Sequence, residues 1–409
     1  MTAEQQLQVL RRGAAEIVPE ADLLARLKSA DSNGRPLRVK LGVDPTAPDL
    51  HLGHSVVLRK LRDFQRLGHE VILVIGDFTA AIGDPSGRSQ TRPPLAEAEI
   101  RAAADSYQQQ CYRILDRERT EVVYNSRWLG AMRFADVVRL TSHYTVARLL
   151  ERDDFAKRFA VHQPISVHEF LYSFCQAQDS VELQADVELG GSDQLFNILM
   201  GRDLQREAGQ PPQVAFILPI LPGLDGVQKM SKSLGNTIGI TEPPQPMFDK
   251  LMSLSDALMP EYFRLLTDLD EPEITSILAG HPLEAKKRLA AAIVSEYHDA
   301  EAAAAARARW EQVFSRRQLP DDLPTLEVAA GQFNEAGRLW LPRLMTLAGL
   351  AGGSREARRL IEQGAVQVDG ARISDVNTEL TLERDTVVQV GRRRFVRARR
   401  GSRAGSAER

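Results

Sequence analysis

Two short strand-like segments on either side of a helical stretch limit the fold of this 409-residue chain more than any other feature. The segments are "RVKLGV" at 38–43 and the wholly apolar "VILVI" at 71–75, and residues 52–67 between them carry apolar side chains at helical spacing. This pattern predicts a strand, a helix and a second strand parallel to the first. A strand that is apolar throughout must be covered on both faces. We therefore expect a doubly wound α/β domain with a parallel sheet, whose ligands bind beyond the carboxyl ends of the strands.

The rest of the chain divides by composition. A later apolar run, "VAFILPIL" at 214–221, predicts another buried strand, and a helical stretch from about 95 to 200 is expected as an insert between strands. After Pro243 and Pro244 the sequence becomes helical, and "SRRQLPDDLPTLEVAAGQFNEAG" at 315–337 has the composition of a linker. We expect an α/β domain with an insert at 1–228, a loop and helical domain at 229–325, a linker and small module at 326–400, and a basic disordered tail at 401–409.

Composition excludes several classes of protein. With 43% hydrophobic and 26% charged residues the chain is typical of globular proteins, and it has no run of eighteen apolar residues that would predict a membrane span. The first twenty residues suit an amphipathic helix and lack the features of a signal peptide. Cys111 and Cys175 lie far apart, which argues against a disulfide framework or a zinc–thiolate site. A cytoplasmic protein is the expectation.

A histidine pair stands where the helix at 52–67 is predicted to begin. In "DPTAPDLHLGH" (44–54), His51 and His54 lie on either side of Gly53. Zinc would need a third ligand, and neither H-E-x-x-H nor a cysteine group is present, so we expect no metal site. Two interpretations remain. Either Asp49 caps the helix with both histidines on its exposed first turn, or the imidazoles and the helix N-terminus bind a phosphate over a floor that Gly53 keeps clear. No Walker or dinucleotide glycine loop occurs in the sequence.

Two lysines lie far downstream in "GVQKMSKSLGN" (226–236), a segment rich in glycine and serine that predicts a mobile loop. Taken alone, Lys229 and Lys232 suit a solvated basic loop. They also suit a loop that closes over a polyphosphate and neutralises its charge during phosphoryl or adenylyl transfer.

The two motifs together carry a resemblance to a known family. "HLGH" after a first strand and "KMSKS" about 180 residues later, before a helical region, resemble the signature pair of the class I aminoacyl-tRNA synthetases. Within that family, "KLGVDPTAPDLHLGH", "GDFTAAIGDPSGR" and "YSFCQAQDSVELQADVELGGSDQ" resemble the bacterial tyrosyl-tRNA synthetases, and the similarity extends over nearly the whole chain. It implies a Rossmann-like catalytic domain with a helical insert. It also implies that the histidines and loop lysines are the catalytic residues: His51, His54, Lys229 and Lys232.

The same resemblance implies roles for further residues. Asp84, Tyr172 and Gln176 would hold the α-amino group of tyrosine and Asp179 its phenolic hydroxyl. Gln194 is a further substrate contact, Asp193 would bind the ribose, and Thr46 would contact the phosphates. The implied ATP-binding set is Asp44, Thr46, His51, Gly53, His54, Asp193, Lys229, Ser231 and Lys232.

Helical spacing supports one part of this assignment independently. Tyr172, Gln176 and Asp179 recur at i, i+4 and i+7, so they share one face of a helix, although such a polar stripe is more often a solvated face. A buried acceptor such as Asp179 is left unpaired when phenylalanine enters, which favours tyrosine. One position departs from the better-known bacterial pattern, because Lys40 stands where a second partner of the hydroxyl is expected.

The C-terminal end is basic. From Ser354 to Arg409 there are thirteen arginines and eight acidic residues, a net charge of +5 against −8 for the rest of the chain. Residues 339–373 predict two helices, a strand and a turn, and resemble the small RNA-binding module named after the fourth protein of the small ribosomal subunit. Arg355, Arg358 and Arg359 on the second helix could simply face solvent, but in this setting they are candidates for tRNA backbone contacts. "GRRRFVRARR" at 391–400 alternates enough to predict a last strand.

The resemblance implies an enzyme that activates L-tyrosine with ATP and transfers it to tRNA(Tyr). Mg²⁺ would accompany ATP, with no permanently bound cofactor and no membrane partner, and the resemblance implies a homodimer formed through the helical insert. A tryptophan-activating relative and a small-molecule adenylyltransferase with an H-x-G-H site are the alternatives. A synthetase-derived RNA-binding protein without activity is a third, and the intact histidines and lysines argue against it.

Overall fold

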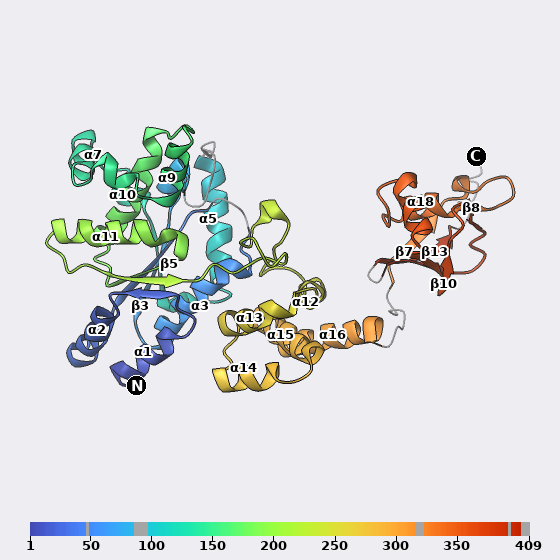
Figure 1. The fold of residues 1–409 in the computed structure, drawn as a ribbon, viewed down its shortest axis with the longest axis horizontal. Coiled ribbons are helices and arrows are strands. Elements are labelled where there is room, and N and C mark those ends of the chain that lie inside the picture. Colours follow the sequence, from blue (N-terminus) through green and yellow to red (C-terminus); the bar gives the residue numbers. More distant parts are fainter. Residues whose placement is uncertain (46–48, 86–96, 316–322, 392–393, 402–409) are drawn as a thin grey trace, which may run out of the picture. The chain divides into compact units, whose positions relative to one another are not determined.

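The computed structural model describes residues 1–409 except 46–48, 86–96, 316–322, 392–393 and 402–409. The chain forms two compact units, Met1–Ala306 and Arg307–Arg409 (Figure 1). In the described part of the chain, no helix is long and apolar enough to cross a membrane.

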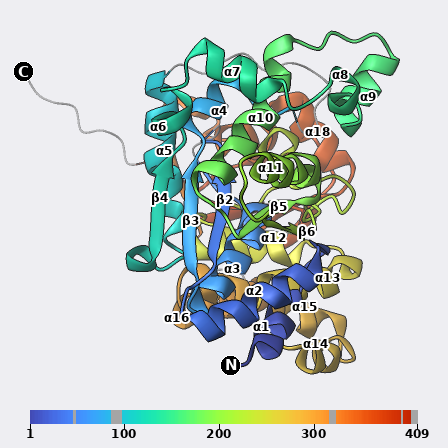
Figure 2. The same cartoon turned by 90° about the vertical axis from the view of Figure 1, so that its left-hand side faces the viewer.

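A six-stranded sheet forms the centre of the first unit, in the order β1-β6-β5-β2-β3-β4 (Figure 2). β2 to β6 are parallel, whereas the short β1 pairs antiparallel with β6 at one edge. The chain builds outward from β2 through β3 and β4, then returns to add β5 and β6 on the other side. The point where the strand order reverses therefore lies between β2 and β5, where such sheets bind ligands. The strands are β1 (Glu16–Val18), β2 (Arg38–Val43), β3 (Glu70–Ile75), β4 (Thr120–Tyr124), β5 (Val187–Gly191) and β6 (Val214–Leu218).

Helices cover both faces of this sheet, because β3 and β6 are buried almost throughout and need cover on each side (Figure 2). The helices up to β6 are α1 (Ala3–Arg11), α2 (Glu20–Asn33), α3 (Leu52–Arg66), α4 (Asp77–Ile82), α5 (Glu97–Cys111), α6 (Ser126–Leu129), α7 (Phe134–Thr141), α8 (Val146–Leu149), α9 (Asp153–Ala160), α10 (Val167–Glu182) and α11 (Leu195–Glu207).

A helical region follows β6 in the same unit. It consists of α12 (Pro244–Met252), α13 (Met259–Leu266), α14 (Glu271–Leu278), α15 (Pro282–Tyr297) and the start of α16 (Ala300–Trp310). Arg59 and Arg62 on α3 form ion pairs with Asp268, between α13 and α14, and with Glu296 on α15. The helix that begins at the histidine pair is thus fixed to the helical region by charge as well as by packing.

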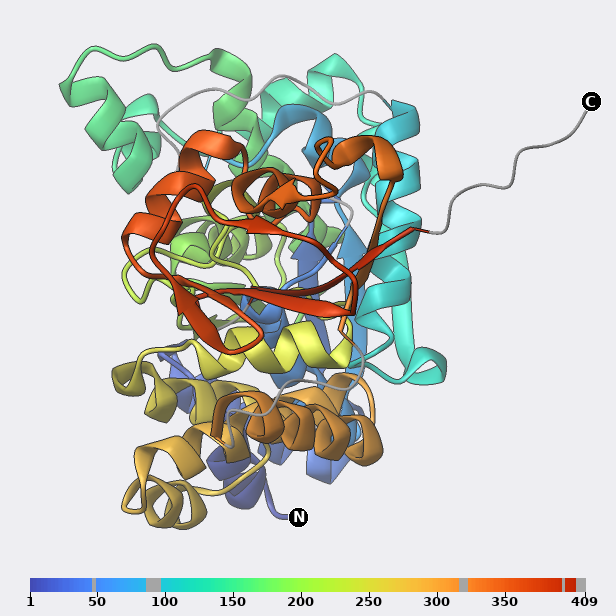
Figure 3. The same cartoon turned by 90° about the vertical axis from the view of Figure 1, so that its right-hand side faces the viewer.

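The second unit is a five-stranded sheet, in the order β10-β9-β12-β13-β7, with helices packed on it (Figure 3). Its core joins Leu341, Leu344 and Met345 of α17 and Ala357 and Ile361 of α18 to alternate residues of the strands. Its elements are β7 (Thr325–Val328), β8 (Leu339–Trp340), α17 (Leu341–Leu347), α18 (Ser354–Glu362), β9 (Val366–Val368), β10 (Ala371–Ile373), β11 (Glu379–Leu380), β12 (Thr386–Val390) and β13 (Arg394–Arg400).

The predicted strands at 38–43, 71–75 and 214–221 and the helix at 52–67 are confirmed within a few residues as β2, β3, β6 and α3. The predicted last strand is β13. Three expectations were wrong in detail. The first twenty residues hold α1 and then β1, the stretch from 95 to 200 contains β4 and β5, and the predicted linker contains β7, which pairs parallel with β13. β1, β4 and β7 are three to five residues long and partly exposed, and the buried β5 is interrupted by Glu188 and two glycines. None of them therefore has the continuous apolar run that identified β3 and β6.

Candidate active site

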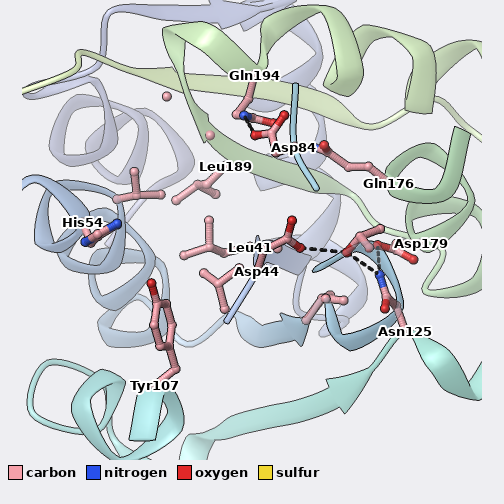
Figure 4. A pocket seen from close by; sticks show the side chains of 18 of the residues that line it. Leu41, Asp44, His54, Asp84, Tyr107, Asn125, Gln176, Asp179, Leu189 and Gln194 are labelled. Carbon is pink, nitrogen blue, oxygen red and sulfur yellow. Dashed lines mark hydrogen bonds between the residues drawn. The ribbon is translucent and has the colours of Figure 1, made fainter. Parts of the chain in front are cut away.

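A cavity of about 300 Å³ opens at the carboxyl ends of β2 and β5, at the reversal of strand order. Figure 4 shows His54 and Tyr107 on one side of it and Asp179 and Asn125 on the other. Eight of the residues predicted for the site line this cavity: Asp44, His54, Asp84, Tyr172, Gln176, Asp179, Asp193 and Gln194. Thr46 lies outside the described residues.

Asp179 lies on α10 at the closed end of the cavity and is only 4% exposed. Trp128 Nε1 donates to its Oδ1 at 2.8 Å, and Asn125 Nδ2 donates to its Oδ2 at 3.3 Å. Burial raises the pKa of Asp179 to about 7, against the opposing influence of the Lys40 ammonium and of these two hydrogen bonds. The site therefore holds a buried acceptor that changes charge near neutral pH.

A second carboxylate, Asp44, follows β2 and faces the same cavity. The hydroxyl of Thr79 donates to its Oδ1 at 2.7 Å, and that of Tyr172 donates to its Oδ2 at 2.9 Å. Burial raises the pKa of Asp44 to about 7, and the charges of Asp84 and Asp179 add to the effect, while the two hydrogen bonds oppose it. The hydrogen bond from Tyr172 to Asp44 thus fixes the orientation of the Tyr172 ring.

Asp84 follows α4 and lies near Gln194 (Figure 4). Gln194 Nε2 donates to Asp84 Oδ2 at 2.8 Å, and Arg152 Nη2 lies 3.3 Å from Asp84 Oδ1. The Arg152 side chain is 4% exposed and also pairs with Asp154 at 2.8 Å. Because Arg152 supplies a positive charge to a cavity with several carboxylates, it is part of the site. Sequence reasoning missed Arg152, Asn125, Trp128 and Thr79, which come from elements far apart in the chain and belong to no short motif.

The histidine pair occupies the first turn of α3. His51 is the N-cap residue: its Nδ1 accepts from Gly53 N at 3.2 Å, and its own backbone N donates to His54 Nδ1 at 3.3 Å. Because both Nδ1 atoms accept, the proton of each neutral ring is on Nε2. The alternative that Asp49 caps this helix is wrong. We also expected free backbone N–H groups at the start of this helix to face an anion. This is wrong for Leu52, whose N–H donates to Ile238 O, and for Gly53, whose N–H donates to His51 Nδ1.

Both imidazoles are neutral at physiological pH. Burial lowers the pKa of His51 to about 3, helped by the charges of His54 and Lys232. His54 is open to the solvent of the cavity, but the surrounding protein and the charges of Lys232 and Lys229 lower its pKa to about 4. The rings lie 3.8 Å apart between centroids. The pair can therefore donate two Nε2–H hydrogen bonds without carrying charge of its own.

The lysine segment lies close to this helix start. Lys232 Nζ is 2.7 Å from Asp49 Oδ2, and Lys229 Nζ is 3.5 Å from Asp193 Oδ2. Asn236 Oδ1 accepts from Ser231 N, and Asn236 Nδ2 donates to Lys229 O. These two hydrogen bonds restrain the centre of the segment that was predicted to be a mobile loop. Both lysines remain partly exposed, 46% for Lys229 and 38% for Lys232. Two cations are therefore held beside the cavity by acidic side chains that an incoming polyphosphate could displace.

Gly53 lets the chain approach closely at this point. A Cβ at position 53 would lie 3.0 Å from the His51 ring and 3.5 Å from Met230 Cβ of the lysine segment. A side chain here would therefore displace the His51 ring from its capping position. Lys40, in contrast, does not line the cavity, because its ammonium is buried beneath it. Among the residues that the structure describes, no group of three histidine, cysteine, aspartate or glutamate side chains is arranged to hold a metal ion.

Arginines gather on α18 in the second unit, where Arg355, Arg358 and Arg359 are exposed. The guanidinium of Arg358 lies 4.8 Å from the centre of the Trp340 ring, which restrains it by a cation–π contact. An exposed basic helix on a compact α/β support is typical of surfaces that bind nucleic-acid backbones.

The first unit thus has the architecture of a nucleotide-binding enzyme. It has an open parallel sheet, and a helix that begins with H-x-G-H lies at the point where the strand order reverses. Residues 32–315 match the family described as tRNA synthetases class I (W and Y), and residues 339–387 match the S4 domain. The chain belongs to the class I tRNA synthetases of tryptophan and tyrosine and, within them, to the bacterial tyrosine–tRNA ligases.

Similar proteins place the chain within this family. It is 57% identical to the tyrosine–tRNA ligase of Moorella thermoacetica, over 96% of this chain and 95% of that protein. It is 50% identical to the enzyme of Syntrophotalea carbinolica, over 97% and 98% of the two chains. Among solved structures, a C-terminally truncated mitochondrial tyrosyl-tRNA synthetase of Aspergillus nidulans has a TM-score of 0.62 at 22% identity, covering 76% of this chain and 94% of that one. The tyrosyl-tRNA synthetase of Archaeoglobus fulgidus, complexed with L-tyrosine, has a TM-score of 0.59 at 22% identity, covering 75% and 99%. At these identities the solved structures support the fold.

Proposed function

We propose that this tyrosine–tRNA ligase activates L-tyrosine with ATP to form tyrosyl-adenylate and pyrophosphate, and then transfers tyrosine to the 3′ end of tRNA(Tyr). One observation carries the proposal: a single cavity joins a buried carboxylate, Asp179, at its closed end to His54 at the start of α3. An apolar ring with a terminal hydroxyl fits the first feature, and a phosphate fits the second. Relatives at 47–57% identity that are named tyrosine–tRNA ligases support the same conclusion.

For the amino acid, Asp179 accepts the hydrogen bond of the phenolic hydroxyl, and its carboxylate is left without this partner when phenylalanine binds. Asp84, Tyr172 and Gln176 line the same cavity and receive the α-ammonium group. Gln194, which donates to Asp84, orients that carboxylate and contacts the substrate. The indole N–H of tryptophan can also donate to a carboxylate, so the preference for tyrosine within this family is supported by the relatives named tyrosine–tRNA ligases.

For ATP, the Nε2–H groups of His51 and His54 contact the phosphates, with Thr46 nearby in sequence. Lys229 and Lys232 move from their acidic partners onto the polyphosphate as the segment closes, which is the electrostatic stabilisation that such transfers need. Asp193, freed from Lys229, binds the ribose. Asp44, Gly53 and Ser231 complete the nucleotide site. Mg²⁺ arrives bound to ATP as part of this substrate.

The first step is an in-line displacement. A carboxylate oxygen of tyrosine attacks the α-phosphorus of ATP, the new P–O bond gives the mixed anhydride, and the bond to the bridging oxygen breaks to release pyrophosphate. Charge grows on the phosphate oxygens, where two neutral imidazole donors and two ammonium groups stabilise it without any covalent enzyme intermediate. In the second step a ribose hydroxyl at the tRNA 3′ end attacks the tyrosyl carbonyl carbon, and AMP leaves.

For tRNA, the S4 domain supplies Arg355, Arg358 and Arg359 to the phosphate backbone. The insert also exposes apolar side chains that suit a homodimer interface: Phe134, Val138, Val146, Phe159, Val161 and Val167. The site of action is the cytoplasm, where bacterial tRNA is charged.

The direct test is aminoacylation. Purified protein with ATP, Mg²⁺, labelled tyrosine and bacterial tRNA should transfer the label to tRNA in a form that mild alkali releases. His54→Asn should lower the rate of adenylate formation at least a hundredfold, because it removes a donor that acts in the transition state. His162→Asn is the matched control: His162 is exposed in the insert and has a φ of 56°, which asparagine tolerates. Absence of labelled tRNA with folded wild-type protein would refute the proposal.

A further inference from the structure

A buried ion pair lies beneath the amino-acid cavity and has no role in the reaction described above. Lys40 in β2 and Glu188 in β5 are directly opposite each other in the parallel register, and Lys40 Nζ lies 3.2 Å from Glu188 Oε1. Each side chain is 1% exposed. Lys40 occupies the position where the sequence predicted a second partner for the phenolic hydroxyl, yet its ammonium points to Glu188 instead.

The pair holds α10 at one residue of the site. Lys40 Nζ donates to the backbone oxygen of Gln176 at 3.1 Å, and Glu188 Oε1 accepts from Gln176 Nε2 at 3.0 Å. Glu188 Oε2 also accepts from Ser180 Oγ at 3.0 Å and from Gln213 Nε2. The backbone and side chain of Gln176 are thus fixed by opposite charges of one pair, from below the cavity that Gln176 lines (Figure 4).

A structural role alone accounts poorly for this arrangement. Two charges buried in the centre of a parallel sheet cost more to desolvate than apolar side chains of similar volume, which often stabilise such a position as well or better. The neighbouring residues of β2, Val39 and Leu41, are apolar and buried, as the sheet requires. The charged pair occurs at the register position from which both side chains bond to Gln176 on α10.

Asp179 is the group on that face that this pair can influence through its charge. It lies three residues after Gln176 on α10, at 4% exposure. The Lys40 ammonium lowers the pKa of Asp179 and the Glu188 carboxylate raises it, and the effect of Lys40 is the larger. The other groups that act on Asp179 or respond to its charge are Trp128 from α6, Asn125 after β4, Asp44 after β2 and Cys175 on α10.

We propose that the Lys40–Glu188 pair is a positioning device of the amino-acid site, which fixes Gln176 against the substrate and sets the charge that Asp179 presents to the phenolic hydroxyl. This inference rests on the proposed tyrosine activation. Lys40 does not bond to the hydroxyl itself; its charge favours the ionised form of Asp179, which does. Neither member of the pair touches the substrate.

The two members should have effects of opposite sign on the pH dependence of tyrosine use. Lys40→Met removes the cation, so Asp179 ionises at higher pH, and the midpoint of kcat/KM for tyrosine moves upward. Glu188→Gln removes the competing anion, so Asp179 ionises at lower pH, and the midpoint moves downward. An upward movement of one pH unit from about 7 lowers the ionised fraction at pH 7 from about one half to about one tenth. This corresponds to a loss of about fivefold at pH 7 that recovers by pH 9.

The experiment measures tyrosine-dependent pyrophosphate exchange of the full chain from pH 5.5 to 9.5, with each variant normalised to its own plateau at high pH. The double variant Lys40→Met with Glu188→Gln should have a midpoint above that of the wild type and below that of Lys40→Met, because the effect of Lys40 on Asp179 is the larger. It also avoids an unpaired buried charge if a single variant fails to fold. Glu169→Gln is the matched control, because Glu169 belongs to another buried ion pair on α10, with Arg158 at 2.6 Å, and is not among the residues that line the amino-acid cavity. Its midpoint should equal that of the wild type.

The inference would be overturned if the midpoints of both single variants moved in the same direction or did not move. If the pair had only a structural role, each variant would lower activity, but the two midpoints would not move in opposite directions. A double variant with the wild-type midpoint and unchanged KM for tyrosine would also overturn it. Failure of the proposed function itself has a different signature, because the wild-type protein would then show no tyrosine-dependent exchange at any pH.

Discussion

In the ligand-free protein, the buried charge of Asp179 should lower the free energy of unfolding. Removal of this charge should therefore stabilise the protein, by an amount that depends on pH. Replacing Asp179 with asparagine keeps the shape of the side chain and removes the charge. Because burial raises the pKa of this carboxyl from 3.8 to about 7, the folded protein holds the proton more tightly than the unfolded chain does. Asp179 therefore costs no stability below pH 3.8 and progressively more as the pH rises toward 7 and above.

The magnitude follows from the pKa difference. Linkage gives a cost of about 4 kcal/mol at pH 8 and about 2 kcal/mol at pH 5 for a carboxyl shifted from 3.8 to about 7. The amide in Asp179→Asn cannot accept from both Trp128 and Asn125, so the variant loses one hydrogen bond, at a cost of about 1 to 2 kcal/mol at any pH. The variant should therefore be about as stable as the wild type at pH 5 and more stable by about 2 kcal/mol at pH 8.

The assay is thermal or urea unfolding of the ligand-free protein at pH 5 and pH 8, followed by circular dichroism. Asp153→Asn is the matched control, because the Asp153 side chain is 94% exposed and its replacement should change stability equally little at both values. Added tyrosine should reverse the order of stability at pH 8, since only the wild type binds it well. Equal effects of Asp179→Asn at pH 5 and pH 8 would refute the reasoning.

Further predictions concern selectivity, catalysis and tRNA. Asp179→Asn should lower kcat/KM for tyrosine much more than for phenylalanine, and an equal loss would show that Asp179 holds another part of the substrate. Lys232→Ala should slow adenylate formation at least tenfold with little change in tyrosine affinity; single-turnover kinetics with an unchanged rate would contradict this. Because the pKa values of His51 and His54 lie at about 3 and about 4, the activation rate at saturating tyrosine should show no histidine titration between pH 6 and 8, and an inflection that disappears in His54→Asn would exclude neutral donors. A chain ending at Ser315 should retain pyrophosphate exchange and lose charging at low tRNA concentration, with a difference that shrinks as salt rises; full charging would remove the S4 domain from tRNA binding.

The central strands and the grouping of the histidines and lysines near the start of α3 were predictable, because each depends on a short stretch of sequence. Continuous apolar runs identify β3 and β6, the segment "RVKLGV" identifies β2, and the H-x-G-H and lysine motifs keep their residues within a few positions of one another. The helical face with Tyr172, Gln176 and Asp179 was equally visible, because a spacing of i, i+4 and i+7 has one geometric meaning on a helix. All three side chains line the cavity.

The support of the site was not predictable in the same way. Asn125, Trp128 and Arg152 reach the carboxylates from separate parts of the chain, and only the fold brings them there. The N-cap also differed from expectation, because a histidine took the position for which Asp49 has the higher intrinsic preference. Lys40 shows the same limit: a lysine inside an apolar strand looked like a missing hydroxyl partner, and its partner on β5 lies 148 residues further along the chain.

Exchange of labelled pyrophosphate into ATP, tested with each proteinogenic amino acid in turn, is the most direct measurement of the central claim. The account predicts exchange that depends on tyrosine, requires Mg²⁺ and ATP, and proceeds without tRNA, since every group assigned to activation lies before residue 234. Exchange that depends on tryptophan would contradict the assignment of Asp179 to a phenolic hydroxyl. Absence of exchange with every amino acid would contradict the activity itself.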